Sequence, residues 1–107
     1  MDVNMFTLSG RVFDMRHSLM RNPEMGGVAE GKISVKIGTK NGEEMIDEFF
    51  IRAYGKRAEY IGSLADGTPV LITGRVREDI RVNSDNTGTV RSKTYFNIST
   101  LKELKGA

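Results

Sequence analysis

One short segment of the chain alternates side chains that suit the binding of flat, negatively charged molecules. Strand side chains alternate with a period of two, so Phe50, Arg52 and Tyr54 should share one face of a strand. Aromatic rings can stack on nucleobases, and a guanidinium beside them can neutralise a phosphate. An ordinary strand surface that carries one buried phenylalanine explains the segment equally well, so the rest of the sequence has to separate the two interpretations.

More aromatic and basic side chains fall at outward positions of other expected strands. They predict a nucleic-acid-binding surface on which rings stack and cations release counterions from phosphates. The predicted binding residues are Arg11, Phe13, Lys36, Phe50, Arg52, Tyr54, Arg75, Arg77, Arg81, Arg91, Lys93 and Tyr95. For the aromatic members the competing interpretation is burial in a core. Residues 77–91 could form a basic arm that wraps the DNA strand, and the competing interpretation is an ordinary solvated charged hairpin.

The residues offer little for catalysis or metal binding. The chain has no cysteine, which rules out a thiolate nucleophile, a disulfide and a cysteine zinc site. Its one histidine, His17, falls in an irregular stretch, where a surface or phosphate contact explains it better than a general base. Four acidic residues, Glu43, Glu44, Asp47 and Glu48, have no histidine near them and suit a solvated hairpin end. We therefore predict a protein that is not an enzyme and uses no metal or cofactor.

Length and charge fit a small binding module. The 107 residues predict a single domain, 1–107, with one modest core. The net charge is only +2, but basic residues dominate between Arg75 and Lys93, which permits a basic face on a nearly neutral body. No apolar run is long enough to span a membrane, and the first residues lack a secretory pattern, so we expect a cytoplasmic protein without a membrane partner.

Five segments have the alternating pattern of strands, and one has the spacing of a short helix. Asn41-Gly42 between two alternating runs predicts a tight hairpin, while Gly10 and Gly74 are candidate bends. The apolar spacing of residues 56–64 predicts a helix of about two turns. The expected strands are residues 6–14, 31–39, 43–54, 68–77 and 90–101.

Two stretches lack a clean period. Residues 15–31 are predicted to form a long loop, and the polar residues 83–89 a hairpin tip. Five strands with one short helix between the third and the fourth predict an all-β protein with the five-stranded Greek-key barrel of the oligonucleotide-binding (OB) fold. An SH3-like barrel and an open sandwich are the alternatives, and the position of the helix argues against both.

The sequence resembles the bacterial and phage single-stranded DNA-binding (SSB) family over most of its length. Residues 54–59 (YGKRAE) are similar to the family's aromatic-Gly-Lys-x-Ala-Glu motif, and residues 66–76 (DGTPVLITGRV) are similar to the strand that follows its short helix. Residues 8–12 (LSGRV) resemble its first strand, and residues 22–24 (NPE) its Asp-Pro-Glu. The combination is more specific than any one of these motifs.

The resemblance implies how this chain works and where it departs from the family. Tyr54 matches the family's stacking aromatic, whereas Glu48 stands where a second aromatic is usual, and the chain has no tryptophan. The family's acidic C-terminal tail is absent, which suggests a tail-less phage or plasmid form or a trimmed chain. The implied function is sequence-nonspecific coating of single-stranded DNA in replication, recombination or repair. The implied partners are further copies of the chain, as a dimer or tetramer, and replication or recombination proteins.

Two other functions remain open for an OB-fold chain of this kind. An accessory replisome subunit, similar to primosomal replication protein B, would bind DNA weakly and a helicase or recombinase tightly. The missing tryptophans and acidic tail favour it modestly. An RNA-binding OB module would instead discriminate RNA from DNA through the 2′-hydroxyl.

Overall fold

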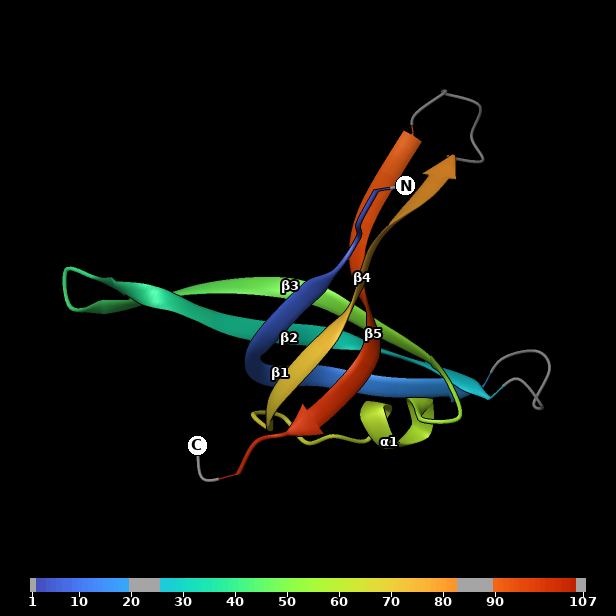
Figure 1. Ribbon diagram of the computed structural model, residues 1–107, viewed down its shortest axis with the longest axis horizontal. Helices are drawn as coiled ribbons and strands as arrows, with labels where there is room; N and C mark the ends of the chain where they lie inside the picture. Colours follow the sequence, from blue (N-terminus) through green and yellow to red (C-terminus); the bar gives the residue numbers. More distant parts are fainter. Residues whose placement is uncertain (1, 20–25, 83–89, 106–107) are drawn as a thin grey trace.

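The computed structural model describes residues 2–19, 26–82 and 90–105, with the backbone alone at 80–82 and 90–91. Figure 1 shows the strands wrapped around one barrel, with a short helix across one end of it. The elements are β1 (Phe6–Leu19), β2 (Gly27–Lys40), β3 (Glu43–Gly55), α1 (Ala58–Gly62), β4 (Pro69–Val82) and β5 (Val90–Glu103). The barrel closes in the order β1-β2-β3-β5-β4, so the predicted five-stranded OB fold with a helix between the third and fourth strands is confirmed. Among the described helices none has the length and apolar character needed to cross a membrane.

Strand β1 curves from one side of the barrel to the other. Its first half pairs with β4, from Phe6 opposite Gly74 to Arg11 opposite Pro69, and its second half pairs with β2. The crossing point is Gly10, where an added Cβ would lie 2.2 Å from the backbone oxygen of Ser34. Only glycine allows β1 to approach β2 this closely, which explains why a bend is found there.

The seam of the barrel lies between β3 and β5. These two strands run parallel and pair through two residue pairs, Ile51 with Phe96 and Arg52 with Asn97. By contrast, β4 and β5 form a long antiparallel ribbon that starts with Val70 opposite Glu103. The short parallel contact therefore brings residues from the middle and the end of the chain side by side on the outside of the barrel.

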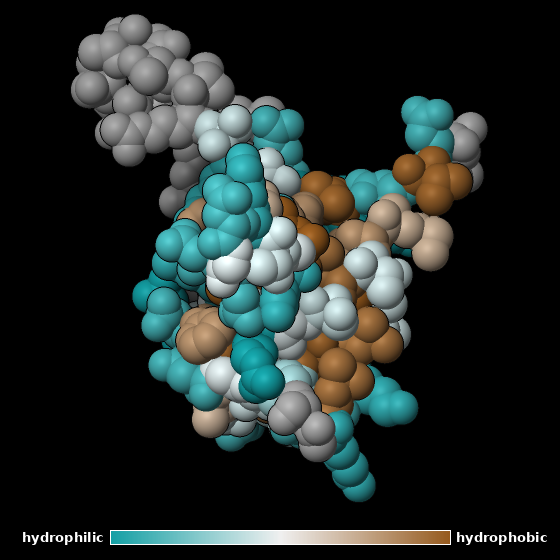
Figure 2. Space-filling view, turned by 90° about the vertical axis from the view of Figure 1, so that its left-hand side faces the viewer, coloured by the Kyte–Doolittle hydropathy of each residue, from teal (hydrophilic) through white to brown (hydrophobic). Residues whose placement is uncertain are grey.

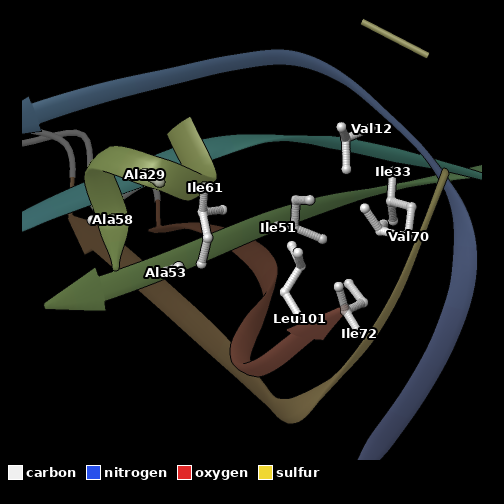
Figure 3. Close-up of a cluster of buried hydrophobic side chains, with 10 residues drawn as sticks. All are labelled: Val12, Ala29, Ile33, Ile51, Ala53, Ala58, Ile61, Val70, Ile72 and Leu101. Carbon is white, nitrogen blue, oxygen red and sulfur yellow. The ribbon is translucent and has the colours of Figure 1, made fainter. Parts of the chain in front are cut away.

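The core follows the predicted alternation. Ile51 and Ala53 of β3 are buried, and Phe49 is half-buried with its ring centroid 4.9 Å from that of Phe96. Figure 3 shows the buried side chains from the strands and from α1 pointing into the barrel. The cluster comprises Val12, Ala29, Ile33, Ile51, Ala53, Ala58, Ile61, Val70, Ile72 and Leu101. Helix α1 contributes Ala58 and Ile61, so it closes one end of the core as its apolar spacing predicts.

The prediction of a long loop at residues 15–31 is wrong. Strand β1 continues to Leu19 and β2 begins at Gly27, and these two residues are register partners. A bulge interrupts the register between Phe13 and Arg16, where Asp14 has a φ of 55°. The bulge changes which residues face inward, from even-numbered positions before it to odd-numbered positions after it. The alternation in the sequence is therefore interrupted, and the second half of β1 was not recognised as a strand. Residues 22–24 and the predicted hairpin tip at 83–89 lie outside the described residues.

Candidate nucleic-acid interface

A groove runs along the outer faces of β3, β5 and β4, above the seam. Arg52 of β3 lies opposite Asn97 of β5, and Asn97 lies opposite Arg75 of β4. The groove is open and has a volume of about 580 Å³. It gathers five of the predicted binding residues: Arg52, Tyr54, Arg75, Arg77 and Tyr95. Residues that are up to 43 positions apart in the sequence thus meet because β3 and β5 pair at the seam.

The groove continues towards Phe50, where cations flank an exposed ring. Phe50 is 40% exposed, and its ring centroid lies 6.2 Å from that of Tyr95. The ammonium nitrogen of Lys93 lies 3.9 Å from the centroid of Phe50, and that of Lys32 lies 5.8 Å from it. A neighbouring hollow is lined by these residues together with Arg16. This end of the groove therefore offers a ring for stacking with positive charges beside it for phosphates.

The side chain of Arg52 is held by the protein itself and is only 12% exposed. Its Nη1 donates a hydrogen bond of 3.0 Å to the Tyr54 hydroxyl, and its Nε lies 3.3 Å from Oε1 of Glu30. Its Nη2 lies 3.8 Å from Oδ2 of Asp79. Burial acts to lower the pKa of Arg52, but the hydrogen bond with Tyr54 and the charge of Glu30 outweigh it and raise the pKa above its ordinary value. The guanidinium is therefore always charged, and in this structure protein groups satisfy that charge.

Tyr95 belongs to the outer face, as predicted, but it is covered. The guanidinium carbon of Arg52 lies 3.6 Å from its ring centroid, and the ammonium of Lys93 lies 5.1 Å from it. Only 7% of the residue is exposed. By contrast, Tyr54 is 50% exposed, so among the described rings of the groove a nucleobase can reach Phe50 and Tyr54 directly.

Of the other predicted residues whose side chains are described, Arg11, Phe13 and Lys36 do not line the groove. Arg11 donates from Nη1 to the backbone oxygen of Gly67 at 2.9 Å, and Lys36 pairs with Glu44 at 2.9 Å on the β2–β3 hairpin. Phe13 is half-buried on β1. Arg81 and Arg91 are register partners on β4 and β5, but their side chains lie outside the described residues.

Sequence reasoning missed several groove residues. Lys32 and Arg16 add positive charge, while Glu30 and Asp79 add negative charge. Asn97 lines the groove, and its Oδ1 is buried without a hydrogen-bond donor among the described residues. The alternation of β2 places Lys32 and Glu30 on its outer face, but the pairing with β3 that brings them to Phe50 and Arg52 was not deduced from the sequence.

The β2–β3 hairpin is the acidic part of the surface. Glu43, Glu44, Asp47 and Glu48 are all exposed, as expected for a solvated hairpin end. Figure 2, which views the molecule from this end, shows hydrophilic side chains over the centre and left of the face and hydrophobic ones gathered on its right. Across the part of the chain that the structure describes, no three acidic or histidine side chains group as a metal ion would require.

Comparisons with known proteins identify the fold. No family model and no curated protein matches the sequence. The structure is similar to the small single-stranded DNA-binding protein from Streptomyces coelicolor, with a TM-score of 0.72 and 20% identity over 98% of this chain and 97% of that one. It is also similar to the Plasmodium falciparum SSB in its complex with single-stranded DNA, with a TM-score of 0.77 and 17% identity over 97% of each chain. This chain therefore has the OB fold of single-stranded DNA-binding proteins.

Proposed function

We propose that the protein binds single-stranded DNA without strong sequence preference and without catalysis, along the groove over β3, β4 and β5. The observation that carries the proposal is the line of rings and cations in this groove. Phe50 and Tyr54 are 40% and 50% exposed, and Arg75 and Arg77 lie on the strand across the groove from them. Each stacked base would contribute roughly 1–3 kcal/mol, and every base offers a ring face, so affinity would depend little on sequence.

The cations give the binding its salt dependence. Arg75, Arg77 and Lys93 can neutralise phosphates and release the counterions that surround a free strand. Because the chain lacks tryptophan, the electrostatic share of the binding energy should be large. The fold that this chain shares with an SSB solved in complex with single-stranded DNA supports single-stranded DNA as the ligand.

The proposed cellular role is to coat exposed strands during replication, recombination or repair in the cytoplasm. An assembly of two or four copies would suit that role. It would also cover apolar residues that a single copy exposes at both ends of β1. Val3 and Met5 are 83% and 76% exposed just before β1, and Leu19 is 72% exposed at its end. Such exposed side chains are typical of contact surfaces between protein chains.

Titration of a fluorescently labelled poly-dT oligonucleotide tests the proposal. We expect the anisotropy to rise on addition of protein, and the affinity to fall as salt is increased. Binding should be similar for mixed sequences of equal length. The proposal is refuted if no binding is seen at low salt. The mass in solution, measured with dT oligomers of graded length, would report the assembly and the occluded length together.

A protein-binding accessory subunit is the second candidate. The acidic residues favour it, because Asp79 lines the groove, Glu30 lines the neighbouring hollow and four more acids lie on the hairpin. Negative charge there weakens the attraction for phosphates. Under this alternative a helicase or recombinase would bind more tightly than DNA does, and a pull-down compared with oligonucleotide affinity separates the two. A uridine oligomer of equal length tests the RNA-binding alternative.

A further inference from the structure

The ring of Tyr95 has the position of a stacking platform, yet another side chain occupies its face. Tyr95 lies on the outer face of β5 beside the exposed ring of Phe50, at 6.2 Å between centroids. It lines both the groove next to Tyr54 and the hollow next to Phe50. The flat guanidinium of Arg52 covers it at 3.6 Å, which is the distance of a stacked planar group. Arg52 therefore occupies the place that a nucleobase would take.

Besides its hydrogen bond to Tyr54, Arg52 is held in this place by two carboxylate contacts that are weak enough to exchange. The carboxylate of Asp79 lies 3.8 Å from Nη2, and Glu30 lies 3.3 Å from Nε without forming a hydrogen bond to it. Both carboxylates belong to side chains that are 35% exposed, where ion pairs contribute little. A phosphate can accept two parallel hydrogen bonds from a guanidinium, which is a stronger arrangement than either carboxylate provides.

We propose that Tyr95 is a third base-stacking subsite, which Arg52 covers in the free protein and vacates when a strand binds. The guanidinium then passes from Glu30 and Asp79 to a phosphate of the strand, and a base takes its place on the ring. The inference rests on the proposed binding of single-stranded DNA. It assigns a role to Glu30 and Asp79, which hold the arginine in place and so weaken binding.

Neutralising the two carboxylates tests the exchange. The double variant Glu30→Gln, Asp79→Asn keeps the shape of both side chains and removes their hold on Arg52. We expect it to bind labelled poly-dT about three- to thirtyfold more tightly than the unmodified protein. The matched control is Glu43→Gln, Asp47→Asn, which makes the same change in net charge on the hairpin outside the groove. Circular dichroism melting checks that both variants fold.

Photocrosslinking tests the subsite directly. A dT oligomer that carries 5-iodouracil reacts with rings on which the base stacks, and mass spectrometry of the digested complex identifies the modified residue. We expect adducts at Tyr95 as well as at Phe50 or Tyr54, with a larger share at Tyr95 in the Glu30→Gln, Asp79→Asn variant.

Three results would overturn the inference. They are equal tightening in the groove variant and the hairpin control, weaker binding by the groove variant, and adducts at Phe50 or Tyr54 with none at Tyr95. In each of these cases the strand still binds, so the proposed function stands. A complete lack of binding by every protein removes the proposed function, and the inference with it.

Discussion

Replacing Tyr54 by alanine should weaken DNA binding while leaving its salt dependence nearly unchanged. The ring is 50% exposed in the groove, so a base can stack on it without rearrangement of the protein. Stacking of one base contributes roughly 1–3 kcal/mol. Its loss therefore corresponds to an affinity about 5- to 150-fold lower. The slope of log affinity against log salt should stay the same, because no charge is removed.

A second variant separates the contribution of the Tyr54 hydroxyl to DNA binding from that of its ring. Tyr54→Phe removes the hydrogen bond to Arg52 but keeps the stacking face, so its affinity should stay within about threefold of the original. Tyr60→Ala is the matched control, since Tyr60 is 44% exposed on α1, away from the groove. Anisotropy titrations with poly-dT at three or more salt concentrations measure both quantities. An equal loss of affinity in the Tyr54→Ala and Tyr60→Ala proteins would refute the placement of the DNA in the groove.

The remaining predictions concern charge, packing and pH. Arg75→Gln combined with Arg77→Gln should lower the salt slope by about 1.4, since each phosphate contact on a single strand contributes roughly 0.7, and an unchanged slope in titrations would contradict this. Gly10→Ala should prevent closure of the barrel, because its Cβ would lie 2.2 Å from a β2 carbonyl oxygen, and a native melting curve would show the reasoning to be wrong. The hydrogen bond from Tyr60 to Glu103 raises the pKa of Tyr60 above 10.0, so its stabilisation is present below that pH and lost as the pH rises past the raised value. Chemical denaturation at rising pH should show this loss, and Tyr60→Phe should lack it.

Much of the fold could be predicted because short segments of the sequence carry the signals for individual strands, turns and the helix. The alternation of β3 identified its buried face correctly, with Ile51 and Ala53 in the core. The hairpin at Asn41-Gly42 is confirmed, and both residues have the positive φ values, 52° and 80°, that this turn requires. The position of a short helix between β3 and β4 then selected the OB fold among small barrels.

The site was harder to predict because bulges change which residues face each other. The turn pairs Lys40 with Glu43, and a regular ladder from there would set Gly31 opposite Arg52. A bulge between Lys36 and Gly38 shifts the register by one residue, so Glu30 lies opposite Arg52 instead. The carboxylate that holds the arginine, and the lysine beside Phe50, both result from that shift. No alternation pattern reveals it, since the extra residue leaves each strand regular on either side.

The covered state of Tyr95 has a similar origin. Its outward position on β5 could be read from the sequence, but its burial depends on Arg52, which reaches it only across the seam between β3 and β5. That contact is parallel and long-range, and neither strand carries a local signal for its partner. The sequence therefore predicted the members of the groove better than their contacts.

Under the proposed function, the narrow seam would give a bound DNA strand a mechanical role. Two residue pairs join β3 to β5, and the groove lies directly above them. Contacts between residues so far apart in the sequence carry a large loop-closure entropy cost. A DNA strand whose bases stack on β3 and whose phosphates contact cations on β4 would hold the two sides of this seam together. DNA binding would then stabilise the closed barrel, and the closed barrel would favour DNA binding. The protein would therefore be more rigid when it is bound to DNA than when it is free.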